Sequence, residues 1–357
     1  MQNVVYQKFR SSLFKGLQGS GTESHGLKAI KKGQIPMNLL IRGIYALLIS
    51  FVISVLVYPK LIPALHKFKF GQTVRDDGPE AHLKKNGTPT MGGISFLCSF
   101  VIAALVLKPT HEVIAVMLVT LGFGVIGFID DYIKIAKHRS LGLRPMQKIV
   151  GQLVICVVFV AYLYKTVGTS IYIPFAGGKM WNLGWLYIPF VIVAVLGTVN
   201  GVNLTDGLDG LSSGVTIIVI VFFTMCAYAA GNGAVIAGGA MIGGLMAYLI
   251  FNAYPAKVFM GDTGSLAMGG FVVAISLVLR MPLFILIAGF IYLIESLSVI
   301  IQVAVYKKTK KRVFKMAPIH HHFELCGIKE TKIVTMFYVI TAIACLIAYL
   351  GCNGIYH

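Results

Sequence analysis

The chain has 357 residues, of which 57% are hydrophobic and only 12% charged, and its formal net charge is +18. A soluble domain carries roughly 25% charged residues, so this composition excludes an ordinary water-soluble protein. The positive charge alone would suit nucleic acid, but in so apolar a chain it indicates basic cytoplasmic loops, and we expect no nucleic-acid partner. The six cysteines are scattered without a Cys-X-X-Cys pair, which argues against disulfides and a zinc site.

The apolar residues form ten runs that approach the length of a bilayer crossing, about 20 residues. The runs lie at 39–58, 91–107, 113–129, 149–164, 185–199, 211–229, 235–251, 265–279, 283–305 and 333–350. We therefore predict an all-α polytopic membrane protein of about ten transmembrane helices, with active-site loops in the cytoplasm. An even number of crossings places both ends of the membrane domain on the same side.

The segment before the first run differs from the rest of the chain. Residues 1–37 have no apolar signal-peptide core, and we expect an N-terminal extension that is flexible or non-native, with Met37 as a natural start. An amphipathic arm is the alternative. Residues 38–357 show no internal repeat and are predicted to form a single transmembrane domain.

Lys and Arg fall unequally on the connections between the runs. Alternate connections hold twenty of them, whereas those on the other side hold four, at Lys108, Lys165, Lys179 and Arg280. Cytoplasmic loops are enriched in Lys and Arg, so the first set is predicted to face the cytoplasm. Six more Lys and Arg precede Met37 on the nominally external side, against this pattern.

Ten of the thirteen acidic residues fall on the same cytoplasmic side. Ionisable groups at membrane depth are costly, so three separate loops that each supply Asp to one face indicate a functional site. For a single Asp, a solvated helix end would be an equal explanation. Acids beside many Lys and Arg fit an anionic substrate together with a divalent cation.

The first two cytoplasmic motifs combine basic residues with a pair of acids. Residues 82–93 contain Lys84 and Lys85, point charges that suit phosphate, although a charged loop alone would explain them. Asp130 and Asp131 stand where the third run ends. Adjacent residues do not share a helix face, so we expect different roles for them. Two neighbouring carboxylates repel each other and attract a cation such as Mg²⁺, which prefers oxygen ligands.

The third motif, residues 200–214, is an unusually polar connection with repeated Asp-Gly-Leu. Asn203, Asp206 and Asp209 recur every third residue and would share one side of a helical turn. A turn that caps the next helix explains one of these acids but not the whole run.

The fourth motif, residues 252–265, places Asp262 between glycines at the start of the eighth run. A glycine-rich helix N-terminus suits an anion, and Asp262 would hold a metal that bridges phosphates. Phe259 and Asn252 would stack on a base and hydrogen-bond to it.

The last motif, residues 307–324, joins a basic run to three consecutive histidines, His320, His321 and His322. The basic run suits lipid head groups, or serves only as a topological signal. One metal bound by all three histidines is awkward in so short a stretch, so we expect hydrogen bonds to phosphate or sugar. Glu295 lies well inside the ninth run, where we expect a helix-packing hydrogen bond.

In this order and spacing, the five motifs resemble those of the polyprenyl-phosphate N-acetylhexosamine-1-phosphate transferase family, and within it the branch that transfers phospho-N-acetylmuramoyl-pentapeptide. The resemblance covers residues 38–350. It implies a magnesium-dependent enzyme of the bacterial plasma (inner) membrane, with ten helices, external termini, a site facing the cytoplasm and usually a homodimer. The implied reaction of peptidoglycan synthesis converts UDP-N-acetylmuramoyl-pentapeptide and undecaprenyl phosphate into lipid I and UMP.

The resemblance also implies roles for single residues. It implies that the catalytic residues are Asp130, Asp131, Asp262 and His320, with Asp262 as the magnesium ligand. Residues around the reacting phosphates would be Asn203, Asp206, Lys134, Lys148, His321 and His322. The nucleoside pocket would be lined by Lys85, Gly207, Leu208, Asp209, Asn252 and Phe259.

Two other classes share part of this pattern. A sister enzyme that transfers N-acetylglucosamine 1-phosphate would have the Asp loops but is not expected to carry the Pro-Ile-His-His-His block. A carrier or lipid flippase would place ionisable groups near the membrane midplane, where only Glu295 lies here. If the protein is such an enzyme, its acceptor is a phosphate monoester, which is mostly ionised at neutral pH and is therefore already a nucleophile. We expect direct attack by the lipid phosphate rather than an aspartyl-phosphate intermediate.

Overall fold

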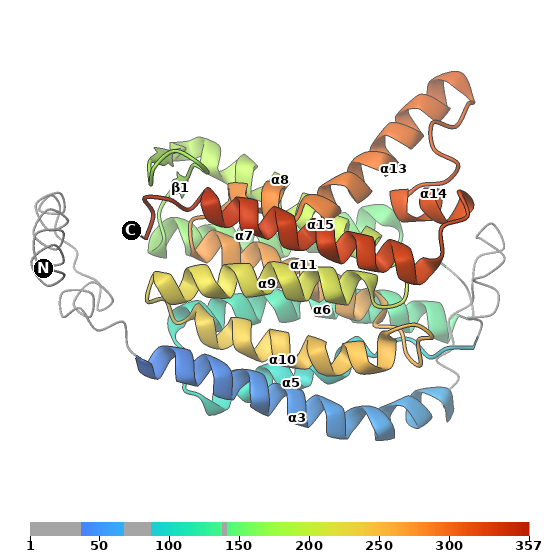
Figure 1. The fold of residues 1–357 in the computed structure, drawn as a ribbon, viewed down its shortest axis with the longest axis horizontal. Coiled ribbons are helices and arrows are strands. Elements are labelled where there is room, and N and C mark those ends of the chain that lie inside the picture. The colour runs from blue at the N-terminus through green and yellow to red at the C-terminus, as the bar shows by residue number, and fades with distance from the viewer. Residues whose placement is uncertain (1–36, 68–86, 138–140, 357) are drawn as a thin grey trace, which may run out of the picture. The chain divides into compact units, whose positions relative to one another are not determined.

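The computed structural model describes residues 37–67, 87–137 and 141–356. Residues Asn38–His357 form one compact unit, in which long helices run back and forth between two ends (Figure 1). A short antiparallel hairpin, β1 (Ser170–Tyr172) and β2 (Met180–Asn182), lies at one of these ends. The helices are α3 (Met37–Lys67), α5 (Gly93–Val106), α6 (His111–Ala136), α7 (Pro145–Thr166), α8 (Tyr187–Thr205), α9 (Leu211–Ala229), α10 (Ala234–Asn252), α11 (Gly261–Val278), α12 (Ile285–Ala288), α13 (Phe290–Thr309), α14 (Ile319–Leu325) and α15 (Glu330–Leu350).

Among the described residues, nine helices are long and apolar enough to cross a membrane, which confirms an all-α polytopic membrane protein. The run predicted at 91–107 forms the shorter helix α5, whose 14 residues span about 21 Å, less than the roughly 30 Å of hydrocarbon. The residues before α5 are bonded to another segment instead. Gly92 N donates to Phe259 O and Phe259 N donates to Pro89 O, both at 2.8 Å. The non-helical backbone is stable here because another segment of the protein bonds to its polar groups.

The ninth predicted run, 283–305, is broken at Gly289 into α12 and α13. A side chain at Gly289 would crowd the carbonyl oxygen of Ile285 and the ring of Tyr292. Beyond this break, α13 leans away from the other helices (Figure 1). In its most apolar stretch 22% of the residues are buried, compared with 89% in α11. Helix α11 is therefore central, while α13 leaves most of its apolar surface for lipid.

Helices α6 and α11 pack closely at Gly127 of α6, where any side chain would overlap the main-chain carbonyl of Asp262. The backbones can approach because glycine has no Cβ. This contact fixes the last turns of α6 against the first turn of α11. It lies beside the acidic residues singled out by the sequence.

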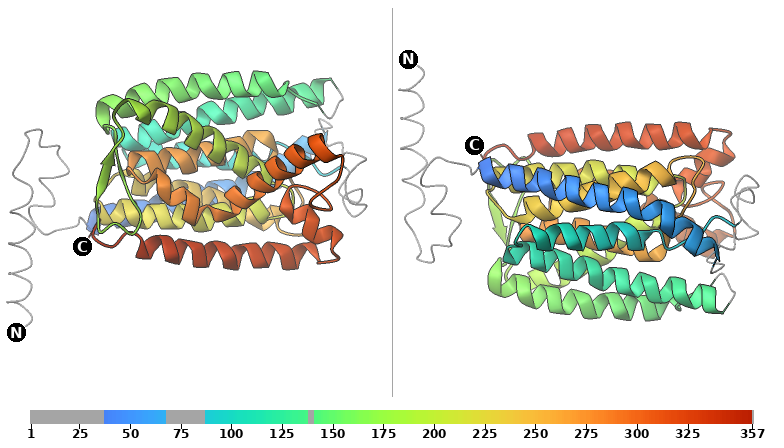
Figure 2. Two further views of the ribbon diagram at one scale, coloured as in Figure 1. Left: turned by 90° about the horizontal axis from the view of Figure 1, so that it is seen from above. Right: turned by 90° about the horizontal axis from the view of Figure 1, so that it is seen from below.

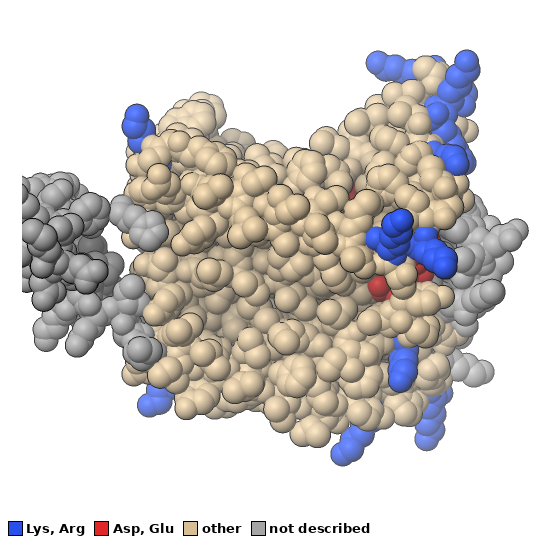
Figure 3. Space-filling view, in the orientation of Figure 1, with Lys and Arg blue, Asp and Glu red and all other residues tan. Residues whose placement is uncertain are grey.

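Helix α3 begins and α15 ends at the end of the bundle where β1 and β2 lie, as an even number of crossings predicts (Figures 1 and 2). The other end carries the connections α6–α7, α8–α9 and α10–α11 together with α14, and we call it the site end. On the face shown in Figure 3, most Lys and Arg gather at the site end, and the broad surface between the two ends is almost free of charge.

Candidate active site

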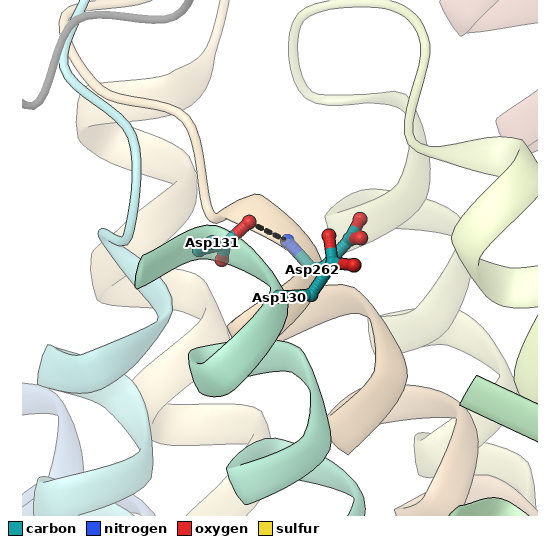
Figure 4. A group of neighbouring side chains, drawn as sticks. All are labelled: Asp130, Asp131 and Asp262. Atoms are coloured by element: carbon teal, nitrogen blue, oxygen red, sulfur yellow. Dashed lines mark hydrogen bonds between the residues drawn. The ribbon is translucent and has the colours of Figure 1, made fainter. Parts of the chain in front are cut away.

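Three aspartates from two helices meet at the site end. Asp130 and Asp131 lie in the last two turns of α6, and Asp262 is the second residue of α11 (Figure 4). One oxygen from each carboxylate lies within 4.8 Å of the others, and Asp130 and Asp131 are buried. The structure therefore brings together the acids that the sequence placed in two separate loops, in a group that can hold a metal ion.

Asp131 caps the start of α11. Its Oδ1 accepts a hydrogen bond from Asp262 N (3.1 Å), and its Oδ2 accepts bonds from Thr263 N (2.9 Å) and Thr263 Oγ1 (2.7 Å). Gly261 has φ +70°, and a side chain there would overlap the carboxylate. A helix N-terminus leaves N–H groups unpaired and favours negative charge, so an acid from another helix fits there. We expected this helix start to bind a substrate anion; that is wrong for these two N–H groups, because Asp131 already takes them.

Asp130 has different partners from its neighbour. Its Oδ1 accepts a hydrogen bond from Leu143 N (2.7 Å) and lies 3.2 Å from Lys148 Nζ. Its Oδ2 lies 2.7 Å from Lys134 Nζ. Figure 4 shows Asp131 turned toward the backbone of α11 and away from the Asp130 side chain. The two acids share Lys134, which lies 3.6 Å from Asp131 Oδ1, but their other contacts differ.

Asp262 collects side chains from three further helices. Lys134 of α6 lies 3.0 Å from Oδ2, and Lys148 of α7 donates a short hydrogen bond to the same oxygen. Asn203 of α8 donates to Oδ1 (3.0 Å) and to Ser265 Oγ (2.7 Å). The predicted phosphate-contacting residues Lys134, Lys148 and Asn203 therefore surround the predicted metal ligand.

The balance of charge in this cluster favours a cation. Three carboxylates face two ammonium groups, which leaves a net charge of −1 when all are ionised. Carboxylate oxygens are the ligands preferred by small, hard divalent ions. The lysines neutralise part of the charge. The residues present thus fit a divalent metal held together with an anionic substrate.

The acids of the α8–α9 connection do not share a helical face, contrary to our expectation. Helix α8 ends at Thr205, so only Asn203 is helical, and Asp206 and Asp209 lie in the loop that follows. Burial raises the pKa of Asp206 to about 8, and the negative charges of Asp262, Asp131 and Asp209 act in the same direction. In the metal-free protein Asp206 is therefore mostly protonated at neutral pH.

The two loops predicted to line a nucleoside pocket are joined by side chains. Asp209 Oδ2 accepts a hydrogen bond from Ala256 N (2.9 Å). Asn252 Oδ1 accepts one from Gly210 N (3.0 Å), while its Nδ2 donates to Val258 O (2.9 Å). Both side chains thus hold the α8–α9 loop against the α10–α11 loop.

The other residues predicted for the nucleoside pocket differ in how deeply they are buried. Leu208 is buried, whereas Gly207 and Phe259 are half-buried. Lys85 lies outside the described residues.

The three histidines lie on α14, a short helix that the sequence did not predict. His320 Nδ1 is 3.0 Å from Glu295 Oε1 of α13, and both side chains are buried. His321 Nδ1 is 2.7 Å from Glu324 Oε2, and His322 Nδ1 accepts a hydrogen bond from Lys315 N (3.2 Å). The ring of His320 packs against Gly207 of the α8–α9 loop.

Two hydroxyl residues of the site were missed in the sequence. Thr263 bonds to Asp131 and Ser265 bonds to Asn203. Both follow Asp262 within one helical turn, and a run of small polar residues at the start of an apolar segment was the available signal.

The fold and the site define a polytopic membrane protein with lysines and aspartates gathered at one end of its bundle. Residues 113–280 match the model of Glycosyl transferase family 4, and residues 85–97 match signature 1 of the phospho-N-acetylmuramoyl-pentapeptide-transferases. The chain is 52% identical to the phospho-N-acetylmuramoyl-pentapeptide-transferase of Clostridium botulinum (strain Alaska E43 / Type E3) over 309 residues, 86% of this chain and 95% of the relative.

Two further relatives carry the same name. The Acetivibrio thermocellus protein is 50% identical over 322 residues, 89% of this chain and 97% of its own length. The Clostridium perfringens (strain 13 / Type A) protein is 49% identical over 309 residues, 86% of this chain and 97% of its own. The chain is a membrane transferase, and it belongs to the phospho-N-acetylmuramoyl-pentapeptide transferase family.

Proposed function

We propose that the protein transfers phospho-N-acetylmuramoyl-pentapeptide from its UDP donor to undecaprenyl phosphate, giving lipid I and UMP in peptidoglycan synthesis. The family uses a nucleotide-sugar donor and a polyprenyl phosphate acceptor. Membership of this family, at about half identity over nearly the whole length of several relatives, is the observation that carries the proposal.

The aspartate–lysine cluster supports this chemistry. In phosphoryl transfer, the barrier is lowered mainly by positioning and by neutralising charge. Lys134 and Lys148 meet at Asp262, so both ammonium groups are held where two anionic phosphates would approach each other. Asp130 keeps these lysines in place from the other side.

We propose Mg²⁺ as the metal and Asp262 as its ligand, with Asp130 beside it. When bound, the ion would neutralise charge on the pyrophosphate of the donor. The hard oxygens of the buried carboxylates and the net negative charge of the cluster support this choice. Asp131 is less available to a metal, because its oxygens accept three hydrogen bonds from α11.

We propose a single displacement. An oxygen of the lipid phosphate attacks the sugar-linked phosphorus of the donor, the new P–O bond forms, and UMP leaves with the bridging oxygen. An aspartyl-phosphate would need a free carboxylate, whereas Asp131 is bonded to α11 and Asp130 is held by Leu143, Lys134 and Lys148. Incubation with the donor alone should therefore release no stoichiometric UMP.

The remaining roles follow the same proposal. Asn203 and Asp206 lie near the reacting phosphates, with His320, His321 and His322 approaching from α14. Lys85, Gly207, Leu208, Asp209, Asn252 and Phe259 belong to the nucleoside pocket, where Asp209 and Asn252 act by holding the two loops together.

We further propose that the protein resides in the bacterial plasma (inner) membrane with the site end in the cytoplasm. Its basic connections lie at the site end, which supports this orientation. The resemblance also implies a homodimer, which we retain as a proposal. The mass of the purified protein in detergent, corrected for bound detergent, tests it.

One assay tests the reaction against the sister enzyme. Purified protein is supplied with undecaprenyl phosphate, Mg²⁺ and each UDP-sugar in turn, and radiolabelled lipid product is measured. We expect UDP-N-acetylmuramoyl-pentapeptide to be used at least about tenfold better than UDP-N-acetylglucosamine, roughly 1.4 kcal/mol in transition-state binding. Equal use of both, or preference for the smaller sugar, would move the assignment to the sister enzyme.

A further inference from the structure

Glu295 and His320 form a buried pair that joins two elements near the site. Glu295 lies on α13 and His320 on α14, and neither side chain is more than 1% exposed. Their hydrogen bond, from Nδ1 to Oε1, is 3.0 Å long. A carboxylate oxygen accepts hydrogen bonds, so we assign Nδ1 as the donor of this bond. The contact therefore determines which ring nitrogen is left to act elsewhere.

The other ring nitrogen has no partner in the described protein. His320 Nε2 is buried without a hydrogen bond, and so is the second oxygen of Glu295. Buried polar atoms are nearly always bonded, and an unpaired one costs about 1–3 kcal/mol. An unpaired nitrogen at a transferase site is therefore best explained as a group that bonds to a ligand.

The direction of the ring points to the substrate loops. A side chain at Gly207 would overlap His320 Nε2, so this nitrogen faces the α8–α9 loop directly. Asp206 precedes Gly207, and Asn203 in the same segment bonds to Asp262. Nε2 thus faces the connection that also contributes to the aspartate cluster.

We propose that Glu295 is a positioning residue for the transfer reaction: it holds His320 by Nδ1, so that Nε2 is presented to the substrate at Gly207. This inference rests on the proposed function and adds to it a residue from the interior of α13. Without the carboxylate, the imidazole can rotate about its side-chain bonds and exchange its two nitrogens. Glu295 therefore acts on the reaction through His320.

A double-mutant cycle tests the link. Glu295→Ala should lower kcat about 10- to 100-fold, the range for loss of a hydrogen bond to a charged group, with little change in KM for the donor. In the His320→Ala background the same substitution should change kcat by less than about twofold, because its only route to the reaction is gone. Additive losses would overturn the proposal.

A conservative variant separates positioning from folding. Glu295→Gln keeps an oxygen that accepts from Nδ1, and it should retain most of the activity that Glu295→Ala loses. If Glu295→Ala does not yield folded protein, Glu295→Gln is measured with His320→Asn and His320→Gln. The side-chain amide of Asn replaces the Nδ1 donor, and that of Gln replaces Nε2. Each variant therefore keeps only one of the two ring nitrogens, and neither should reach the wild-type rate. A wild-type rate with either would count against an oriented imidazole.

The matched control is Tyr292→Phe. It removes another buried hydrogen bond of α13, that between Tyr292 and Thr216 of α9 (2.8 Å), and it should leave kcat within about twofold of wild type. If it lowers kcat as much as Glu295→Ala, the effect is loss of α13 packing and the proposal fails. An inactive wild-type protein would instead contradict the proposed function, so the two failures are distinguishable.

Discussion

Asp131 and Thr263 are joined by two hydrogen bonds, one to the main-chain N–H and one to the hydroxyl, although they stand 132 positions apart. The acid at the end of α6 is therefore the cap of α11. Asp130, one residue earlier, pairs with Lys148 and lies closer to Lys134 than Asp131 does. Neighbouring acids of one motif thus have separable effects, one on stability and the other on turnover.

Asp131→Asn should destabilise the protein by about 1–3 kcal/mol, because the amide group turns a donor toward the N–H groups of α11. The measurement is the midpoint of thermal unfolding in detergent. Thr263→Val removes only the hydroxyl bond and should lower the midpoint less. An unchanged midpoint for Asp131→Asn would show that α11 does not depend on this cap.

Asp262→Asn should reduce turnover on the order of 100-fold, since it removes one charge from the centre of the cluster. The magnesium concentration needed for half-maximal lipid I formation should also rise. Glu112→Gln, at the far end of α6, is the control and should behave as wild type. Near-normal activity of Asp262→Asn at low magnesium would remove Asp262 from the role of metal ligand.

The raised pKa of Asp206 predicts a dependence of stability on pH. The folded-state value is about 8, whereas an unfolded Asp titrates near 3.9. Its contribution to stability is fully present below pH 4 and is lost as the pH rises through 8, because the unfolded chain gives up its proton first.

In EDTA, therefore, the unfolding midpoint of Asp206→Asn should fall less between pH 5 and pH 8 than that of wild type. The control Glu112→Gln should follow the wild-type curve. Identical slopes for Asp206→Asn and wild type would mean that Asp206 is ionised in the folded protein.

A cysteine at Lys310, exposed after α13, should react with a membrane-impermeant thiol reagent only after the cytoplasmic face is opened. A cysteine at Lys179, exposed near β2, should react in intact cells. The native thiols Cys98 and Cys326 are exposed and are first replaced by Ser. The reverse pattern would overturn the proposed orientation.

The composition and the apolar runs were enough to predict the class of fold and most of its helices. They failed where tertiary contacts replace helical hydrogen bonds. The non-helical backbone before α5 is held by main-chain hydrogen bonds with Phe259, from a distant segment, and by Tyr58. The break between α12 and α13 falls at Gly289, where a side chain would crowd Ile285 and Tyr292.

For the site, sequence motifs identified the aspartates, because acids beside apolar runs are conspicuous. They could not indicate the partner of each acid. The helix start at Asp262 was predicted to bind a substrate anion, yet Asp131 occupies two of its N–H groups. Similarly, Asn203, Asp206 and Asp209 have a three-residue spacing, but α8 ends before the second of them. Such pairings depend on the packing of α6 against α11, which no local pattern encodes.

The cap contributed by Asp131 has a consequence for biogenesis. The ribosome delivers α6 to the membrane before α11, with four helices made in between. During that interval Asp130 already has Lys134 one turn away on the same helix, whereas Asp131 has none of its α11 partners. A nascent chain interrupted before Gly261 therefore has Lys134 beside Asp131 (3.6 Å) but none of the three hydrogen bonds from α11. These three hydrogen bonds form only once α11 packs against α6, so they belong to a late step in the assembly of the membrane protein.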